Sequence, residues 1–174
     1  MPPEGPESGI VVRVTVPPAL ERLRARWDRA AGVGVPAHVT VLYPFVPPAD
    51  LDLGVRQAVA AIAAAHEPFD VRFARVGRFP TAVYLAPEPA APFNRLTEAF
   101  HARFPAFPPY GGAFDEVIPH LTITESAVAP LDDIEREAAR SLPFDRRVSS
   151  LEVLVEDDAG RWRPRWRLRL GVRP

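Results

Sequence analysis

Hydrophobic and polar positions alternate along this chain with two different periods. Runs with a period of two, or rich in β-branched residues, predict strands at 10–16, 37–45, 69–76, 82–86, 118–124, 151–155 and 161–170. Apolar residues at helical spacing predict helices at 18–31, from 55 to about 66, at 93–104 and at 131–142. Residues 77–80 and 157–160 have the composition of turns, and 106–117 is expected to be an ordered loop that could cover a site.

The predicted elements form an architectural repeat. The order strand, helix, His-x-Thr strand, helix occurs over 10–62 and again over 82–142. We expect an α+β fold in which two halves face each other about a pseudo-two-fold axis, with both His-x-Thr strands across one groove. Residues 1–9 are expected to be a flexible tail, and residues 10–174 a single domain.

Composition narrows the chemistry that this chain can carry. It has 174 residues, no Cys, and a formal net charge of −1, and all 21 of its basic residues are Arg. The lack of Cys excludes disulfides and thiol catalysis, and the charge argues against a surface devoted to long nucleic acid. No apolar run approaches the ~20 residues of a membrane span, and the polar first nine residues do not resemble a signal peptide. We therefore expect a cytoplasmic protein that does not bind a membrane.

Candidate chemistry is concentrated in two triplets, His38-Val39-Thr40 and His120-Leu121-Thr122. Strand side chains alternate faces, so each triplet offers an imidazole and a hydroxyl on one side. Two imidazoles can supply a general base and a general acid, and two hydroxyls can bind phosphoryl oxygens. One such triplet is more often structural than catalytic, but two in similar apolar surroundings favour a shared site.

These motifs resemble those of the two-histidine (2H) phosphoesterases, a family that includes 2′-5′ RNA ligase-like proteins and cyclic nucleotide phosphodiesterases. The H-x-T-x pattern with apolar x matches 38–41 and 120–123, and the order of elements is similar from about 10 to 170. The resemblance implies a bilobal α+β fold, with a mainly antiparallel sheet in each half and outer helices around a central cleft.

For function, the resemblance implies catalysis by His38, Thr40, His120 and Thr122 without metal or cofactor. One His would activate water or a ribose hydroxyl, the other would protonate the leaving oxygen, and the Thr residues would hold phosphoryl oxygens. The sequence leaves open which His is which. The expected substrate is a nucleotide or RNA-end phosphoester, such as a 2′,3′-cyclic phosphate or a 2′-5′ phosphoester.

Two departures from the family pattern bear on the substrate. Thr124-Glu125-Ser126 stands where many RNA-directed members have a basic residue, and Tyr43-Pro44-Phe45 lacks the glycine often found after the first motif. Both favour a small phosphoester over long RNA. A 2′-5′ RNA ligase and a non-catalytic nucleotide-binding module are the alternatives.

The remaining candidates are weaker. Tyr43 and Tyr84 could stack on a base or ribose, and we expect them to bind substrate. His66 and His101 are expected at the surface, and no third ligand accompanies the motif His residues for zinc. The arginines that alternate along 161–169 are expected to form the solvated face of an edge strand. We expect a monomer with no stable protein partner.

Overall fold

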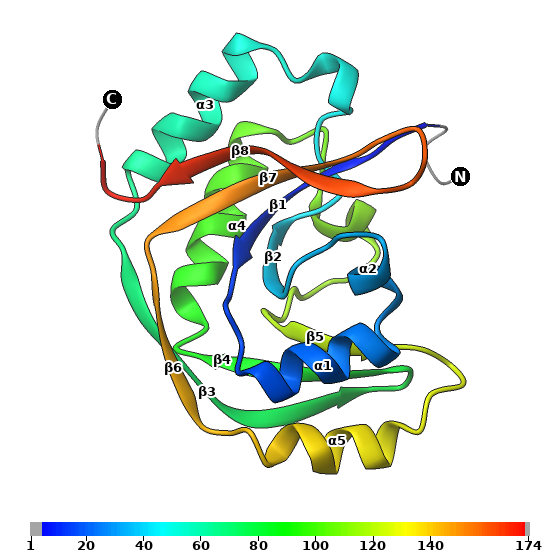
Figure 1. Ribbon diagram of the computed structural model, residues 1–174. Helices are drawn as coiled ribbons and strands as arrows, with labels where there is room; N and C mark the ends of the chain where they lie inside the picture. Colours follow the sequence, from blue (N-terminus) through cyan, green and yellow to red (C-terminus); the bar gives the residue numbers. More distant parts are fainter. Residues whose placement is uncertain (1–4, 173–174) are drawn as a thin grey trace.

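The computed structural model describes residues 5–172 and contains one curled, antiparallel, eight-stranded sheet with the order β6-β3-β4-β5-β2-β1-β7-β8 (Figure 1). The strands are β1 (Ser8–Arg13), β2 (His38–Leu42), β3 (Phe69–Phe79), β4 (Ala82–Glu88), β5 (Leu121–Glu125), β6 (Phe144–Val148), β7 (Ser150–Glu156) and β8 (Trp162–Arg169). The helices are α1 (Pro18–Trp27), α2 (Arg29–Gly32), α3 (Leu53–Ala64), α4 (Ala91–Arg103) and α5 (Leu131–Ala139), with 3-10 turns at Pro48–Asp50 and Pro109–Gly112. The α+β fold class is confirmed.

The sheet consists of two pseudo-symmetric halves. One half has the order β8-β7-β1-β2 and the other has β6-β3-β4-β5, so the two meet where β2 pairs with β5. In each half the His-x-Thr strand pairs with the strand that precedes its helix, β1 with β2 and β4 with β5. The predicted repeat is therefore present, and its two motif strands are the central strands of the sheet.

The two connecting helices cross over the seam between the halves. α1 joins β1 to β2 but packs against β5, whereas α4 joins β4 to β5 but packs against β2. α5 lies beside α1 under β3 and β4, and α3 lies beside α4 near β8 (Figure 1). Each helix thus covers the motif strand of the opposite half, which locks the two halves together.

The main apolar core lies between these helices and one face of the sheet. Strand residues such as Val12, Val39, Leu85 and Leu121 are fully buried there, together with Leu20 of α1. Because strand residues alternate, the residues on either side of each core residue face the opposite way. His38 and Thr40 flank Val39, so the motif side chains lie on the face that the helices do not cover.

Several boundaries differ from the sequence prediction. β1 begins at Ser8, whose hydroxyl donates to the carbonyl of Val46 over 2.6 Å, so Ser8 and Gly9 belong to the sheet and not to the predicted tail. Residues 1–4 of that tail lie outside the described residues. The helix expected over 18–31 is divided at Asp28, whose carboxylate accepts from the amide of Ala30 and caps α2.

The second half contains two further differences. β3 continues through the expected turn at 77–80 because Gly77 pairs with Tyr84 of β4, and the reversal comes at Pro80 and Thr81. β6 was not predicted, since its sequence Phe-Asp-Arg-Arg-Val is mostly polar, yet it pairs with β3 at the sheet edge. β8 is the opposite edge strand, as predicted, and its arginines are exposed.

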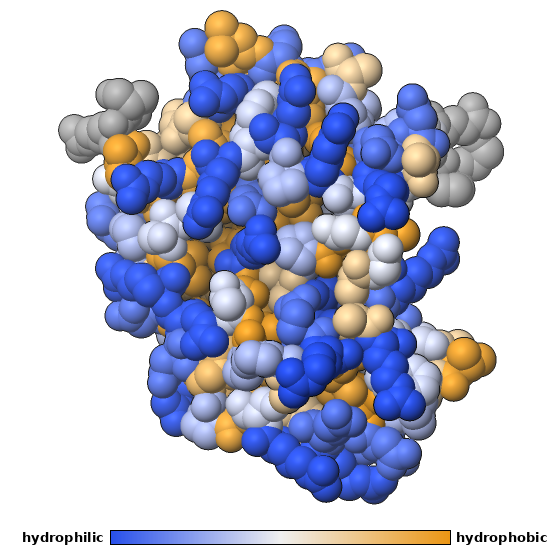
Figure 2. Space-filling model, in the orientation of Figure 1, coloured by the Kyte–Doolittle hydropathy of each residue, from blue (hydrophilic) through white to orange (hydrophobic). Residues whose placement is uncertain are grey.

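Hydrophilic side chains cover most of the face seen in Figure 2, and apolar ones emerge in small groups between them. Within residues 5–172, no helix is both long and apolar enough to cross a membrane.

Candidate functional site

The pairing of β2 with β5 places the four motif residues on one face of the sheet. Val39 lies opposite Leu121, and both side chains are fully buried in the core. The same antiparallel register sets His38 opposite Thr122 and Thr40 opposite His120, on the other face. Directly opposed side chains have Cβ atoms about 4.5–5.5 Å apart, so the four groups surround one point. The predicted convergence of the two triplets is present in the structure.

The two imidazoles are held in the same way. Nδ1 of His38 lies 2.7 Å from the carbonyl oxygen of Pro36, and Nδ1 of His120 lies 2.7 Å from that of Ile118. A carbonyl oxygen can only accept, so each Nδ1 carries a hydrogen and each Nε2 is left to exchange protons. Nε2 of His38 lies 3.1 Å from Oγ1 of Thr40, within the same motif.

The surroundings of His38 favour its neutral form. The pKa of His38 is lowered to about 4, mainly by burial, with the Pro36 carbonyl opposing this shift and the nearby charges of Arg24 and His120 adding to it. At neutral pH the Nε2 atom of His38 is therefore a lone-pair acceptor.

A buried arginine lies behind the seam. Arg24 of α1 is 1% exposed, and its Nε donates to the carbonyl of Thr122 over 3.2 Å. Its Nη2 donates to the Asp28 carboxylate over 2.9 Å and to the carbonyl of Val35 over 3.3 Å. One side chain thus joins α1 to β5 and to the segment that leads into β2, and it brings a positive charge beneath the motif residues.

Hydroxyl groups reinforce this attachment. Oγ1 of Thr97 in α4 donates to the carbonyl of Val41 in β2 over 2.8 Å. Oγ1 of Thr124 in β5 donates to the carbonyl of Trp27 at the end of α1, also over 2.8 Å. Each motif strand is therefore hydrogen-bonded to the helix that packs behind it, β2 to α4 and β5 to α1.

Aromatic rings surround His120. Tyr84 lies opposite Thr122 in the β4–β5 register, and its ring centroid is 5.6 Å from that of His120. Phe79 stacks on Tyr84 at 4.4 Å and meets the His120 ring edge-on at 5.2 Å. Gly77 makes room for this arrangement, because a Cβ there would lie 2.2 Å from Cζ of Tyr84. The predicted binding residue Tyr84 is thus at the site.

The loop expected to cover a site contributes a third aromatic residue, which the sequence did not single out. The Tyr110 ring stacks on the His120 ring at 6.4 Å with an interplanar angle of 19°. Burial raises the pKa of Tyr110, and the nearby Thr40 hydroxyl partly opposes this rise. The Tyr110 amide also donates to the carbonyl of Tyr43 over 2.6 Å, so Tyr110 lies between the His120 ring and the end of β2.

Other candidates have different environments. The Tyr43 hydroxyl donates to Glu7, and the Tyr43 ring meets Trp162 edge-on at 6.2 Å, so its role in binding stays a prediction. His66 is 2.8 Å from the carbonyl of Ile62 at the end of α3, and His101 lies within α4. Within residues 5–172, no group of three His, Asp or Glu residues is arranged to hold a metal ion.

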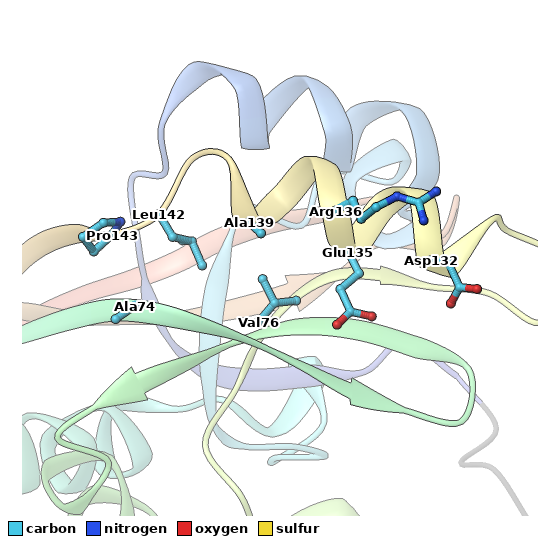
Figure 3. A pocket seen from close by; sticks show the side chains of 8 residues that line it. All are labelled: Ala74, Val76, Asp132, Glu135, Arg136, Ala139, Leu142 and Pro143. Carbon is cyan, nitrogen blue, oxygen red and sulfur yellow. The ribbon is translucent and has the colours of Figure 1, made fainter.

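A pocket of about 610 Å³ lies between α5 and β3 (Figure 3). It is on the face of the sheet opposite to the motif residues. Its wall includes Val76, which pairs with Leu85 of the core face, whereas the neighbouring Gly77 belongs to the face that bears the motifs. At its rim Arg78 is 2.9 Å from both Asp132 and Glu135. This pocket is separate from the two imidazoles.

The fold and the site define a class of protein: a bilobal antiparallel sheet with two His-x-Thr strands paired at its centre. The sequence matches the 2′-5′ RNA ligase superfamily over residues 12–160, and the chain belongs to this family of two-histidine phosphoesterases. This membership supports a phosphoesterase- or ligase-type enzyme. No curated protein matches the sequence significantly.

Solved structures share the fold at low sequence identity. TT0787 of Thermus thermophilus has a TM-score of 0.63 and 18% identity, with 97% of this chain and 100% of that chain covered. E. coli LigT complexed with NADP+ has a TM-score of 0.54 and 16% identity, with 98% and 100% covered. A protein described as a phosphoesterase has a TM-score of 0.56 and 16% identity, with 97% and 100% covered.

The contact between Gly77 and Tyr84 can be tested by Gly77→Ala. The added methyl must displace the Tyr84 ring, and we expect a loss of about 1–3 kcal/mol in unfolding free energy together with a shifted His120 ring resonance. Urea denaturation and imidazole NMR measure these two effects. Gly32→Ala is the matched control, because a Cβ there meets nothing within 4 Å. Equal behaviour of the two variants would contradict the proposed contact.

Arg24→Met tests the buried cation. The substitution leaves the Asp28 carboxylate buried without its partner, and we expect a loss of about 3–5 kcal/mol in unfolding free energy. Arg22→Met, on the exposed side of the same helix, should change it by about 0.5 kcal/mol or less. Chemical denaturation at neutral pH gives both values. A loss at Arg24 no larger than at Arg22 would show that the buried network contributes nothing.

The lowered pKa of His38 predicts a pH dependence of stability. Between about pH 4 and pH 6.5 the unfolded chain binds a proton at His38 and the folded chain does not, so stability rises with pH across this window. His38 contributes at most about 1.4 kcal/mol per pH unit there. His38→Gln should show a correspondingly smaller slope when unfolding free energies are compared across the window. Identical slopes would mean that His38 titrates normally.

Proposed function

We propose that this protein is a metal-independent phosphodiesterase that acts on a 2′,3′-cyclic phosphate or a related 2′-5′ phosphoester of a nucleotide or small RNA end. Its catalytic residues would be His38, Thr40, His120 and Thr122, within one bilobal domain over residues 10–174. The observation that carries this proposal is the register of β2 with β5, which gathers two imidazoles and two hydroxyls on one face of the sheet.

The environments of the two His residues suggest how the roles divide. His38 is neutral at neutral pH, so its Nε2 is suited to take a proton from the attacking water. As the water oxygen bonds to phosphorus, the bond from phosphorus to one ribose oxygen breaks. A protonated His120 then gives its Nε2 hydrogen to that departing oxygen, and the product is a phosphate monoester. The nearby Arg24 charge disfavours a second cation at His38, which supports this assignment.

Binding of the phosphoryl group is assigned to donors around the seam. The hydroxyls of Thr40 and Thr122 can donate to its non-bridging oxygens. The positive charge of the buried Arg24 guanidinium, on the core face of the sheet, favours binding of an anion at the site. Tyr84 offers a ring face beside His120, where a base or ribose could stack. Tyr43 is kept as a second, more distant binding residue.

The size of the substrate is inferred from two observations. Solved structures of E. coli LigT are described as complexes with 3′-AMP, with ATP and with NADP+, which are two mononucleotides and one dinucleotide. This chain has Thr124-Glu125-Ser126 after the second motif and no added basic residue there. Both favour a nucleotide-sized phosphoester. The family description keeps a 2′-5′ RNA ligase as the alternative, since the same groups serve the reverse reaction.

Turnover of 2′,3′-cyclic nucleotides by the purified protein in EDTA tests the proposal. We expect a single monoester product by ³¹P NMR, and we expect His38→Ala and His120→Ala each to lower kcat/KM by about 10²-fold or more, since each removes a proton-transfer group. His101→Ala, in α4, is the matched control and should retain the wild-type rate. Normal turnover by either motif variant would reject the assigned roles.

Ligation and binding assays on the same purified protein distinguish the proposed phosphodiesterase from the two alternatives. A ligase would join RNA ends bearing these groups and would bind RNA with a strong salt dependence in gel-shift assays. A non-catalytic nucleotide-binding module would bind nucleotides tightly without turnover across a broad panel of phosphoesters. Cyclic-phosphate opening with weak RNA binding is the outcome that the proposal expects.

A further inference from the structure

The arginines of β8 do not all face the same way. Strict alternation along residues 161–169 would place them on one face of the edge strand, but the register between β7 and β8 shifts midway along the pair. On one side of the shift Arg163 lies opposite Val155, which belongs to the helix-facing core. On the other side Arg167 lies opposite Glu152. The shift therefore divides the arginines between the two faces of the sheet.

Arg167 and Arg169 lie on the face that carries the two motifs. Directly opposed residues of an antiparallel pair share a face. Thr40 of β2 lies opposite Val11 of β1, which in turn lies opposite Glu152 of β7. Glu152 lies opposite Arg167, so one row of side chains runs from the first motif to the edge strand. Arg169, two residues further along β8, has the same orientation.

The Arg167 side chain is held toward the centre of the sheet. Its Nε donates to Oγ of Ser150 on β7 over 3.1 Å, so the guanidinium leans from the edge strand toward β7. β7 is two strands from β2, or about 9–10 Å at the usual strand spacing. The bond to Ser150 uses Nε alone, and the terminal nitrogens of Arg167 are further donors on the motif face.

The charges of these two arginines are not neutralised within residues 5–172. Exposed arginines of the other half form ion pairs with nearby carboxylates, namely Arg72, Arg75, Arg136 and Arg147. Arg167 and Arg169 are also exposed, but neither forms an ion pair with a described residue. Glu152 lies opposite Arg167, yet it is 3% exposed and one of its carboxylate oxygens is buried without a hydrogen-bond partner. The motif face therefore presents two cations beside the first motif.

We propose that Arg167 and Arg169 form a second anion subsite, which binds a further phosphate of the substrate one nucleoside away from the phosphate between the two imidazoles. This inference rests on the proposed function and narrows its substrate class to nucleotides with two phosphate groups, such as a 2′,3′-cyclic nucleotide that also carries a 5′-phosphate. Guanidinium groups bind phosphate oxygens through paired N–H donors. The span from β2 to the Ser150 contact is comparable with the separation of the two phosphates in such a nucleotide.

Equilibrium binding measures what the added phosphate contributes. The ligands are adenosine 3′-monophosphate and adenosine 3′,5′-bisphosphate, compared by isothermal titration calorimetry. We expect the wild type to bind the bisphosphate about 10-fold more tightly, as for two exposed ion pairs that each contribute about threefold. Arg167→Gln and Arg169→Gln should each reduce this preference, and the double variant should abolish it. Added salt should also reduce the preference of the wild type, because both arginines are exposed.

Arg163→Gln is the matched control. It removes the same charge from an exposed position of the same strand, but on the opposite face of the sheet. It should keep the wild-type preference for the bisphosphate, and all of these variants should unfold at urea concentrations close to that of the wild type. An equal loss of preference in Arg163→Gln and Arg167→Gln would show a general effect of charge and would overturn the subsite.

Turnover provides a second readout on the same variants. The ratio of kcat/KM for 5′-phosphorylated to unphosphorylated 2′,3′-cyclic AMP should fall in Arg167→Gln, with the change in KM. A preference for the bisphosphate that depends on both arginines, in a protein without turnover, would keep the subsite and reject the proposed reaction. Turnover of 2′,3′-cyclic AMP together with equal affinity for the two ligands would overturn the subsite and keep the proposed function.

Discussion

One strand register determines this site. Where β2 and β5 meet, Val39 faces Leu121 in the core, so the residues on either side of each turn away from the helices. A shift of one residue in either strand would bury an imidazole and expose a core side chain, at a cost of several kcal/mol. The hydrophobic core and the candidate catalytic group are therefore positioned by the same pairing, and the remaining contacts refine it.

Contacts on both faces of the sheet keep the seam in place. On the core face, α1 and α4 cross behind the opposite half, and Arg24 and Thr97 donate to carbonyls of β5 and β2. On the motif face, Tyr84 and Tyr110 contact the His120 ring. The strand order of the two halves corresponds, but the surroundings of the imidazoles differ, since the charge of Arg24 acts on His38 and aromatic rings surround His120. Different environments are what allow two identical side chains to take opposite roles in proton transfer.

The features that could be predicted from sequence are those that follow from the spacing of apolar and polar residues within a single strand or helix. The alternation within each His-x-Thr triplet indicated the shared face, and the repeated element order indicated the two halves. Arg24 was missed although it lies four residues after Leu20 on the apolar stripe of α1. One of its partners, Thr122, is about a hundred residues away in β5. The other, Asp28, lies at a break between α1 and α2 that the sequence did not predict. Tyr110 was missed because its position depends on a left-handed backbone and on partners in both halves. No periodic pattern contains such information.

The most direct test of this account is a crystal structure with a bound nucleoside 2′- or 3′-monophosphate, the two monoesters that opening of the cyclic ring can give. The account predicts the phosphorus atom between the Nε2 atoms of His38 and His120, with the hydroxyls of Thr40 and Thr122 on its non-bridging oxygens. A phosphate bound elsewhere, for example in the pocket between α5 and β3, with the two imidazoles uncontacted, would contradict it.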